Sequence, residues 1–189
     1  IKIFKKKIAN LVFMRFLFLI IFIFNMSEPF VLFDFSKESN IQNWIVVNDG
    51  VMGGLSKGKF SVDDRGYGFF TGNVSLENNG GFSSVRYNFE SKFVSSFKKI
   101  TLRLKGDGKQ YQIRVKTRIS DYYSYIAYIK TNGEWQTLEI MFSEMIPSFR
   151  GNKLDLPNYS GEYMEQFAIL IGNKKNEAFE LYLDKITLE

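Results

Sequence analysis

The sequence predicts an all-β protein, an antiparallel β-sandwich of the jelly-roll type, with an N-terminal hydrophobic leader outside the fold. Its body consists of short segments in which apolar and polar residues alternate, as they do in strands with one buried face. Clusters of turn-forming residues separate these segments at short intervals. No amphipathic helical pattern longer than a turn or two interrupts them. About ten short strands in a single domain favour two packed antiparallel sheets.

The expected strands follow one another along the body of the chain. They are Val31–Phe35, Trp44–Val47, Lys59–Val62, Phe69–Ser75, Phe82–Asn88, Ile100–Leu104, Tyr111–Arg118, Tyr123–Ile129, Trp135–Phe142, Gln166–Ile171 and Phe179–Leu188. The last strand changes phase, because its apolar residues occupy odd positions up to Leu183 and even positions from Ile186, which predicts a bulge or bend. Short helical turns are expected within Met141–Ile146 and Tyr159–Met164.

Turn-forming residues predict how the strands are connected. Asn132-Gly133 is the strongest short hairpin signal, because both central residues of a type I′ turn need positive φ. Gly106-Asp107-Gly108 also fits a hairpin loop. We therefore expect the strands on either side of each turn to pair, and the last two strands to form a further pair.

The composition excludes several classes of function. The 189 residues include no cysteine and no histidine, which excludes thiol nucleophiles, disulfides, Cys/His zinc sites and imidazole catalysis. The net charge is +5, but residues 1–25 hold five basic residues and no acidic one, so the rest of the chain is neutral. A neutral body lacks the positive surface of nucleic-acid-binding domains, and no nucleic-acid partner is expected.

Residues 1–27 are interpreted as a leader and residues 28–189 as one folded domain. The leader combines a lysine cluster with the apolar run Phe16–Phe24, a pattern typical of a signal peptide or an anchor. The run is shorter than the roughly 20 residues that span a bilayer. A start of translation at Met14 or Met26 is the alternative interpretation. The protein is thus membrane-anchored or exported if the leader is translated and cytoplasmic otherwise, and membrane contact is expected only through the leader.

The stretch Gly53–Lys59, with the sequence GGLSKGK, is close to a phosphate-binding P-loop. Phe60 occupies the position where Ser or Thr would supply a hydroxyl to magnesium. A P-loop also precedes a helix, whereas these glycines precede the expected strand Lys59–Val62. We do not expect nucleotide binding here.

Several long motifs, in a fixed order, resemble those of the complex I intermediate-associated protein family. They lie at Trp44, Asn48 to Ser56, Gly72 to Phe82, Gly106 to Tyr111, Gly133 to Trp135 and Phe149 to Gly151. The resemblance implies a galactose-binding-like β-sandwich without a catalytic centre. Mitochondrial members act as assembly factors for respiratory complex I, and bacterial relatives share the domain. A non-enzymatic binding module for a protein partner, an assembly intermediate of a membrane complex, is therefore expected.

The candidate binding residues are the motif members that are not needed merely to turn the chain. They are Asn48, Asp49, Met52, Ser56, Glu77, Asn78, Asn79, Arg86, Asp107, Tyr111 and Arg150. Gathered at one end of a sandwich, they would form either a buried polar network or a ligand surface. No catalytic residue, no metal ligand and no cofactor is assigned.

Three alternatives remain open. A carbohydrate-binding module would stack a glycan on Tyr122, Tyr123, Tyr125 or Tyr128, whereas Trp44 and Trp135 are expected in the core. An enzyme would use the carboxylates of Asp49, Glu77 or Asp107 for acid-base chemistry. A structural calcium ion would need Asp34 and Asp184, in the first and last strands, as ligands.

Overall fold

A computed structural model describes residues 28–189, and the predicted leader, residues 1–27, lies outside the described residues. The strands are β1 (Phe30–Asp34), β2 (Trp44–Asn48), β3 (Lys57–Val62), β4 (Gly68–Val74), β5 (Ser83–Phe93), β6 (Lys99–Lys105), β7 (Gln110–Lys116), β8 (Ser124–Lys130), β9 (Trp135–Met141), β10 (Ile146–Phe149), β11 (Asn152–Lys153), β12 (Tyr163–Ile171) and β13 (Glu177–Leu188). The 3-10 turns are η1 (Asp49–Met52), η2 (Glu77–Asn79) and η3 (Phe142–Glu144). No helix within residues 28–189 is long and apolar enough to span a membrane.

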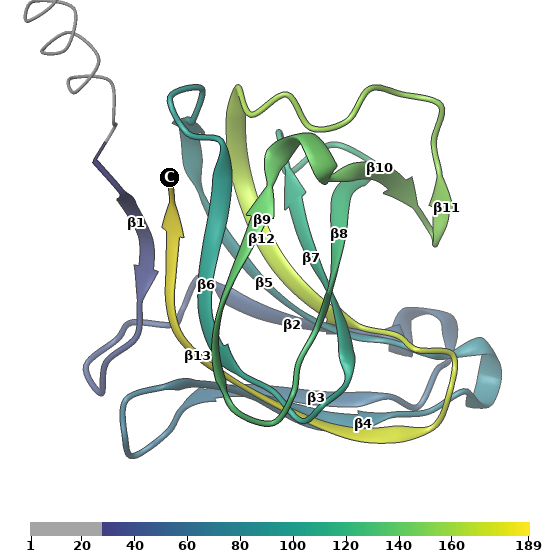
Figure 1. The fold of residues 1–189 in the computed structure, drawn as a ribbon. Coiled ribbons are helices and arrows are strands. Elements are labelled where there is room, and N and C mark those ends of the chain that lie inside the picture. The colour runs from purple at the N-terminus through teal and green to yellow at the C-terminus, as the bar shows by residue number, and fades with distance from the viewer. Residues whose placement is uncertain (1–27) are drawn as a thin grey trace, which may run out of the picture.

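The strands form two antiparallel sheets, which confirms the predicted all-β sandwich. A six-stranded sheet has the order β3-β4-β13-β6-β9, with β1 beside β13. A seven-stranded sheet has the order β11-β10-β8-β7-β12-β5-β2. In Figure 1 the strands β3, β4 and the first part of β13 run along the bottom, while β1, β6 and the end of β13 rise on the left.

The core lies between the two sheets and follows the alternation of the sequence. In β6 the buried side chains are Ile100, Leu102 and Leu104, and in β7 they are Tyr111, Ile113 and Val115. Burial of each aliphatic side chain of this size contributes roughly 1.5–3 kcal/mol. The intervening side chains of each strand point away from the core, so both sheets have an outer face.

The last strand bends where its apolar pattern changes phase. The register of β13 against β6 shifts between Leu183 and Lys185, so one extra residue is inserted there. The shift moves the inward-facing positions from odd to even, and Leu183 and Ile186 are both buried. Figure 1 shows β13 turning upward along its length. The predicted bulge is confirmed.

The predicted hairpins are wrong. β8 and β9, on either side of Asn132-Gly133, lie in different sheets, as do β6 and β7, and β12 and β13. Gly133 has a φ of 88°, but Asn132 is not among the residues of positive φ, so a type I′ turn does not form. The glycine-containing turns instead carry the chain from one sheet to the other across the core.

The secondary structure differs from the sequence-based expectation in two further segments, before β12 and at β10. Residues 159–162 are not helical, and β12 begins at Tyr163, inside the expected turn Tyr159–Met164. The strand β10 was not expected because it contains Pro147, which lacks the N–H that a strand donates. The other expected turn, within Met141–Ile146, is confirmed by η3.

Of the two tryptophans, only Trp44 is a core residue. Its ring is 7% exposed and stacks against Phe60 and Tyr87, with ring centroids 4.9 Å away in each case. Trp135 is half-buried and packs against Tyr67 at a centroid distance of 4.6 Å. The prediction of a core position for Trp135 is therefore wrong.

Replacing the two tryptophans one at a time should separate their roles. Trp44→Ala should lower the free energy of unfolding by about 3–5 kcal/mol, because it leaves a cavity between stacked rings. The control Trp135→Ala should lower it by about 1 kcal/mol or less. Urea denaturation followed by circular dichroism measures both values. Equal losses would contradict the assignment of Trp44 to the core.

Candidate functional site

Asp49 is the centre of a hydrogen-bonded cluster formed by the β2–β3 and β4–β5 connections, which lie on the right-hand side of Figure 1. Its side chain is 2% exposed. Oδ1 accepts a hydrogen bond from the N–H of Ser56 at 3.1 Å, and Oδ2 accepts one from the Ser56 hydroxyl at 2.5 Å. Oδ2 also accepts from the N–H groups of Gly81 at 2.6 Å and Phe82 at 3.2 Å. One carboxylate thus joins the β2–β3 and β4–β5 connections.

Asn48 extends this cluster into the neighbouring strands. Its Oδ1 accepts hydrogen bonds from the N–H of Gly58 at 3.0 Å and from the Ser83 hydroxyl at 2.7 Å. Gly54 is required by the close approach of the chain, since a Cβ at this position would lie 2.4 Å from Oδ1 of Asp49. Asn48, Asp49 and Ser56 therefore hydrogen-bond to other groups of the protein and form a largely buried polar network.

The next part of the same motif faces solvent. Glu77, Asn78 and Asn79 form the exposed turn η2 beside the cluster. Asn78 and Asn79 have φ values of 55° and 60°, a left-handed conformation that Asn tolerates better than most residues. The side chain of Met52 lies outside the described residues.

Asp107 and Tyr111 form a second cluster, between the two sheets. The buried Tyr111 hydroxyl donates to Oδ1 of Asp107 at 2.9 Å. Oδ2 of Asp107 accepts from the Lys109 amine at 2.7 Å and from the N–H of Glu180 at 3.0 Å. Because Tyr111 belongs to β7 and Glu180 to β13, the Asp107 carboxylate ties one sheet to the other.

The two predicted arginines lie apart from both clusters. Arg86 is in the middle of β5, on the outer face of the seven-stranded sheet. Arg150 lies in the turn between β10 and β11, exposed, with its guanidinium 5.2 Å from the ring centroid of Phe149. Arg114, in β7, shares the outer face with Arg86. The sequence reasoning missed Arg114, although its position in an alternating strand could have placed it there.

The possible calcium ligands are engaged with cations of the protein. Asp34 forms an ion pair with Lys185 at 2.7 Å, and Asp184 forms one with Arg103 at 2.6 Å. Within residues 28–189, no group of three or more acidic side chains is arranged to hold a metal ion.

The tyrosines of the glycan alternative do not form one platform. Tyr125 packs against the core, whereas Tyr128 is exposed on the outer face of the seven-stranded sheet. Tyr122 is exposed and packs edge-on against Phe149, with ring centroids 5.3 Å apart. Tyr123 contacts both Tyr122 and Tyr125.

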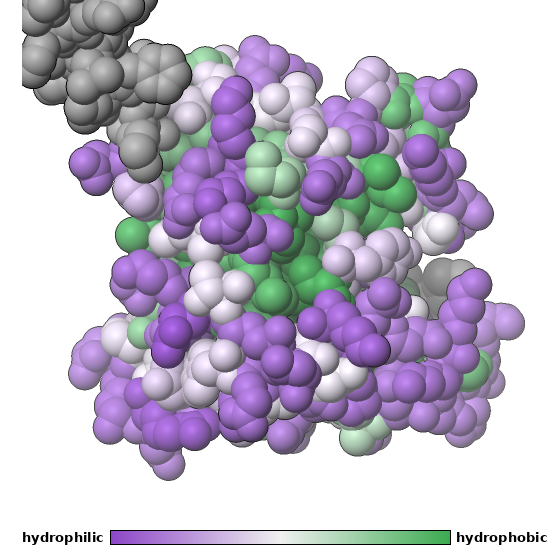
Figure 2. Space-filling view, viewed as in Figure 1, coloured by the Kyte–Doolittle hydropathy of each residue, from purple (hydrophilic) through white to green (hydrophobic). Residues whose placement is uncertain are grey.

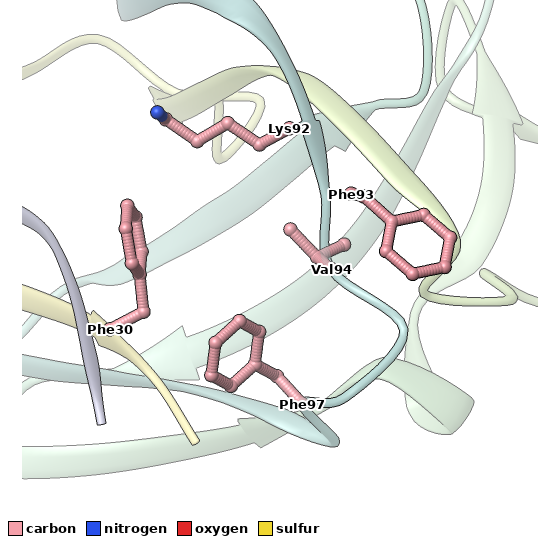
Figure 3. Close-up of a pocket in the computed structure, with 5 residues that line it drawn as sticks. All are labelled: Phe30, Lys92, Phe93, Val94 and Phe97. Carbon is pink, nitrogen blue, oxygen red and sulfur yellow. The ribbon is translucent and has the colours of Figure 1, made fainter. Parts of the chain in front are cut away.

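A small apolar pocket of about 220 Å³ lies beside the start of β1. Phe30, Lys92, Phe93, Val94 and Phe97 line it. In Figure 3 the Lys92 side chain extends past the Phe30 ring, and its amine is 5.2 Å from the ring centroid. The space-filling view in Figure 2 shows a mostly hydrophilic surface with apolar side chains near its centre. None of the predicted site residues lines the pocket.

The hydrogen bonds also set the protonation of the two clustered carboxylates. Burial by itself raises the pKa of Asp49, but the donors on Ser56, Gly81 and Phe82 outweigh it and hold that pKa below its ordinary value. Burial likewise raises the pKa of Asp107, but its hydrogen bonds and the charge of Lys109 have the larger effect. The pKa of Asp107 is therefore also below its ordinary value. Both groups are therefore carboxylates at neutral pH with their oxygens occupied.

Removing the Asp49 carboxylate should lower the stability of the fold. Asp49→Ala leaves the N–H groups of Ser56, Gly81 and Phe82 without their acceptor, and each such group costs about 1–3 kcal/mol when it is buried. The Ser56 hydroxyl keeps only its longer hydrogen bond to the Ser75 carbonyl, at 3.3 Å. We expect the free energy of unfolding to fall by at least about 3 kcal/mol. The matched control Glu77→Ala, in the exposed turn of the same motif, should change it by about 0.5 kcal/mol or less. An Asp49→Ala protein as stable as the wild type would show that Asp49 is free for a ligand.

The lowered pKa values also predict acid sensitivity. Asp49 and Asp107 bind protons more readily in the unfolded state, so their contribution is complete well above the ordinary pKa of 3.8 and is lost as pH falls below it. Urea denaturation between neutral pH and about pH 3 should show this loss. Asp49→Asn should weaken the pH dependence. An unchanged slope in this variant would contradict the assignment.

The fold is similar to that of solved carbohydrate-binding modules. A family 11 carbohydrate-binding module from Clostridium thermocellum, in complex with a β-1,3-1,4-mixed-linked tetrasaccharide, matches with a TM-score of 0.62 and 17% identity over 86% of this chain and 96% of that chain. The agarase AgWH50C matches with a TM-score of 0.57 and 13% identity over 86% of this chain and 24% of that chain. At these identities the similarity shows the β-sandwich fold alone.

Sequence relatives point to one family. The mitochondrial Complex I intermediate-associated protein 30 of Drosophila melanogaster is 29% identical over 157 residues, which are 71% of this chain and 53% of the relative. The mouse protein of the same name is 26% identical over 153 residues, 69% of this chain and 47% of the relative. The chain thus spans about half the length of these curated relatives. Because the model of the Complex I intermediate-associated protein 30 family matches residues 33–183, the chain belongs to that family.

Proposed function

We propose that this protein is a non-catalytic binding module that acts in the assembly of a membrane protein complex by holding a protein intermediate. Its relatives carry the name of a complex I intermediate-associated protein, which supports a protein partner. The observation that carries the proposal is that the carboxylates of these motifs accept hydrogen bonds from other groups of the same chain. Asp49 and Asp107 accept hydrogen bonds at both oxygens from groups of their own chain.

This arrangement speaks against carboxylate catalysis. A general acid or base needs a carboxyl group that can reach the substrate proton. The oxygens of Asp49 and Asp107 are occupied, and their lowered pKa values favour the charged form over the protonated form that an acid catalyst needs. Glu77 is the exposed member of the three, in the turn η2. The occupied oxygens of Asp49 and Asp107 therefore support a binding role over the carboxylate catalysis considered for these residues.

Affinity purification of the tagged full chain from its own cells tests the proposal. We expect subunits of one membrane complex to be enriched over a mock purification, and the same subunits to recover this chain when they carry the tag. Deletion of the gene should lower the amount of that assembled complex on native gels. Normal assembly in the deletion strain, together with no enrichment, would overturn the proposal.

A carbohydrate-binding role is the second candidate, because the family 11 module shares the sandwich. The exposed rings of Tyr122 and Tyr128 could each stack against a sugar. Titration calorimetry with the mixed-linked tetrasaccharide measures this directly. We expect no heat of binding. Binding that disappears in Tyr128→Ala but persists in Tyr182→Ala, on the other sheet, would favour the carbohydrate role over the assembly role.

A further inference from the structure

Two arginines flank a small residue on the outer face of the seven-stranded sheet. Ala168 in β12 pairs with Arg86 of β5 on one side and with Arg114 of β7 on the other. The residues next to them in sequence, Val85 and Val115, are buried in the core. Because neighbouring side chains of a strand point to opposite faces, both arginines lie on the outer face, one on each side of a methyl group.

Neither arginine has a carboxylate partner within the part of the chain that the structure describes. Among residues 28–189, Arg86 forms no ion pair or hydrogen bond through its guanidinium. Arg114 donates from Nη1 to Oε1 of Gln112 at 2.7 Å, which orients the guanidinium without neutralising it. The other sheet differs, because Arg65 pairs with Asp63 at 2.8 Å and Arg103 with Asp184 at 2.6 Å. Unlike Arg65 and Arg103, the arginines on the outer face of the seven-stranded sheet therefore carry positive charge that no described carboxylate pairs with.

These positive charges are also close enough to one another to interact unfavourably. Burial and, after it, the charge of Arg86 lower the pKa of Arg114 to about 10. Burial and then Arg86 likewise lower the pKa of Lys116, whereas the charge of Asp121 raises it, and the Lys116 amine donates to the backbone carbonyls of Ile119 and Asp121. Asp121 thus offsets part of the Lys116 charge, but the two neighbouring guanidinium groups of Arg86 and Arg114 are costly to keep half-buried without a counter-charge. An anion bound among them would remove that cost.

A groove continues this face toward the loop between β12 and β13. Its volume is about 730 Å³, and its lining includes Gln112 and Tyr128 from the outer face. The charged side chains that line it are all lysines, Lys109, Lys174 and Lys175. Lys109 and Lys175 pair with Asp107 and Glu177, whereas Lys174 forms no ion pair among the described residues. Lys174 is therefore the residue of this groove that adds unpaired positive charge near Gln112, the hydrogen-bond partner of Arg114.

We propose that the outer face of the seven-stranded sheet binds an extended acidic segment of a protein partner, with carboxylate groups held by Arg86 and Arg114. Guanidinium groups bind carboxylates through paired hydrogen bonds, which gives the contact a defined geometry. This inference rests on the proposed assembly function and names the binding surface and the chemistry of its occupant.

The apolar neighbours favour a peptide over an acidic glycan. In register with Arg86 and Arg114 lie Ile45 of β2 and Ile126 of β8, and Ile146 of β10 follows. Ile126 is only 3% exposed, so Ile45 and the half-buried Ile146 are the side chains of this row that a partner can reach. Sugars stack on aromatic rings, whereas this row contains aliphatic side chains that suit the apolar residues of a protein segment. Ile45 is 47% exposed and lies on the edge strand of the sheet. A segment with alternating acidic and apolar residues would match both kinds of side chain.

Titration of the full chain with a short synthetic peptide, in which Glu alternates with Val, tests the proposal. The control peptide has Gln in place of Glu. Nuclear magnetic resonance should show shifts of the Arg86 and Arg114 side-chain N–H signals, with affinity for the Glu peptide at least about tenfold higher than for the Gln peptide. The double variant Arg86→Gln/Arg114→Gln should lose this preference, while Arg65→Gln/Arg103→Gln should keep it.

Three outcomes would overturn the inference. They are equal affinity for the two peptides, an unchanged preference in the Arg86→Gln/Arg114→Gln protein, and tighter binding of an oligogalacturonate, which would assign the face to an acidic glycan. Thermal melting checks that both double variants are folded. If the wild-type chain still enriches its membrane complex from cells while any of these outcomes holds, the assembly function stands and only the proposed binding surface is wrong.

Discussion

The Asp49 carboxylate is the constraint on which the loop end of this sandwich depends. It collects donors from the β2–β3 and β4–β5 connections, which belong to segments far apart in sequence. Gly54 and Gly80 are glycines because a Cβ at either position would collide with that carboxylate. The glycine-dense motif resembles a phosphate-binding loop because its backbone surrounds an anion, and that anion is the Asp49 carboxylate. The anion is supplied by the protein, so the loop has no need of one from a ligand.

The arginines beside the two sheets differ in whether a carboxylate pairs with them, and the proposed binding surface rests on that difference. Arg65, in the turn between β3 and β4, and Arg103, in β6, have carboxylate partners and lie over aromatic rings. On the seven-stranded sheet, Arg86 and Arg114 are half-buried and have no such partner among residues 28–189. Surface ion pairs add little stability, but leaving two desolvated cations unpaired is unfavourable. Unpaired arginines on this face are therefore better explained by binding than by a contribution to stability.

The sequence predicted the strands well and their partners poorly. Alternation identifies a strand such as Ile100–Leu104 because burial on one face is a local pattern. It does not say whether the next strand lies beside it or across the core, which depends on packing over the whole chain. Asn132-Gly133 therefore suggested a hairpin that does not exist. Likewise, the Asp49 motif identified a polar cluster, but Arg114 becomes significant only when strand register places it across Ala168 from Arg86.

The central claim is that a protein partner docks on the outer face of the seven-stranded sheet. Site-specific photo-crosslinking in living cells tests it most directly. A photoreactive residue in place of Tyr128, which is exposed on that face, should cross-link to an acidic segment of a membrane-complex subunit. The same residue in place of Lys59, exposed in β3 of the other sheet, should not. Cross-links to that subunit from position 59 and none from position 128 would contradict the account.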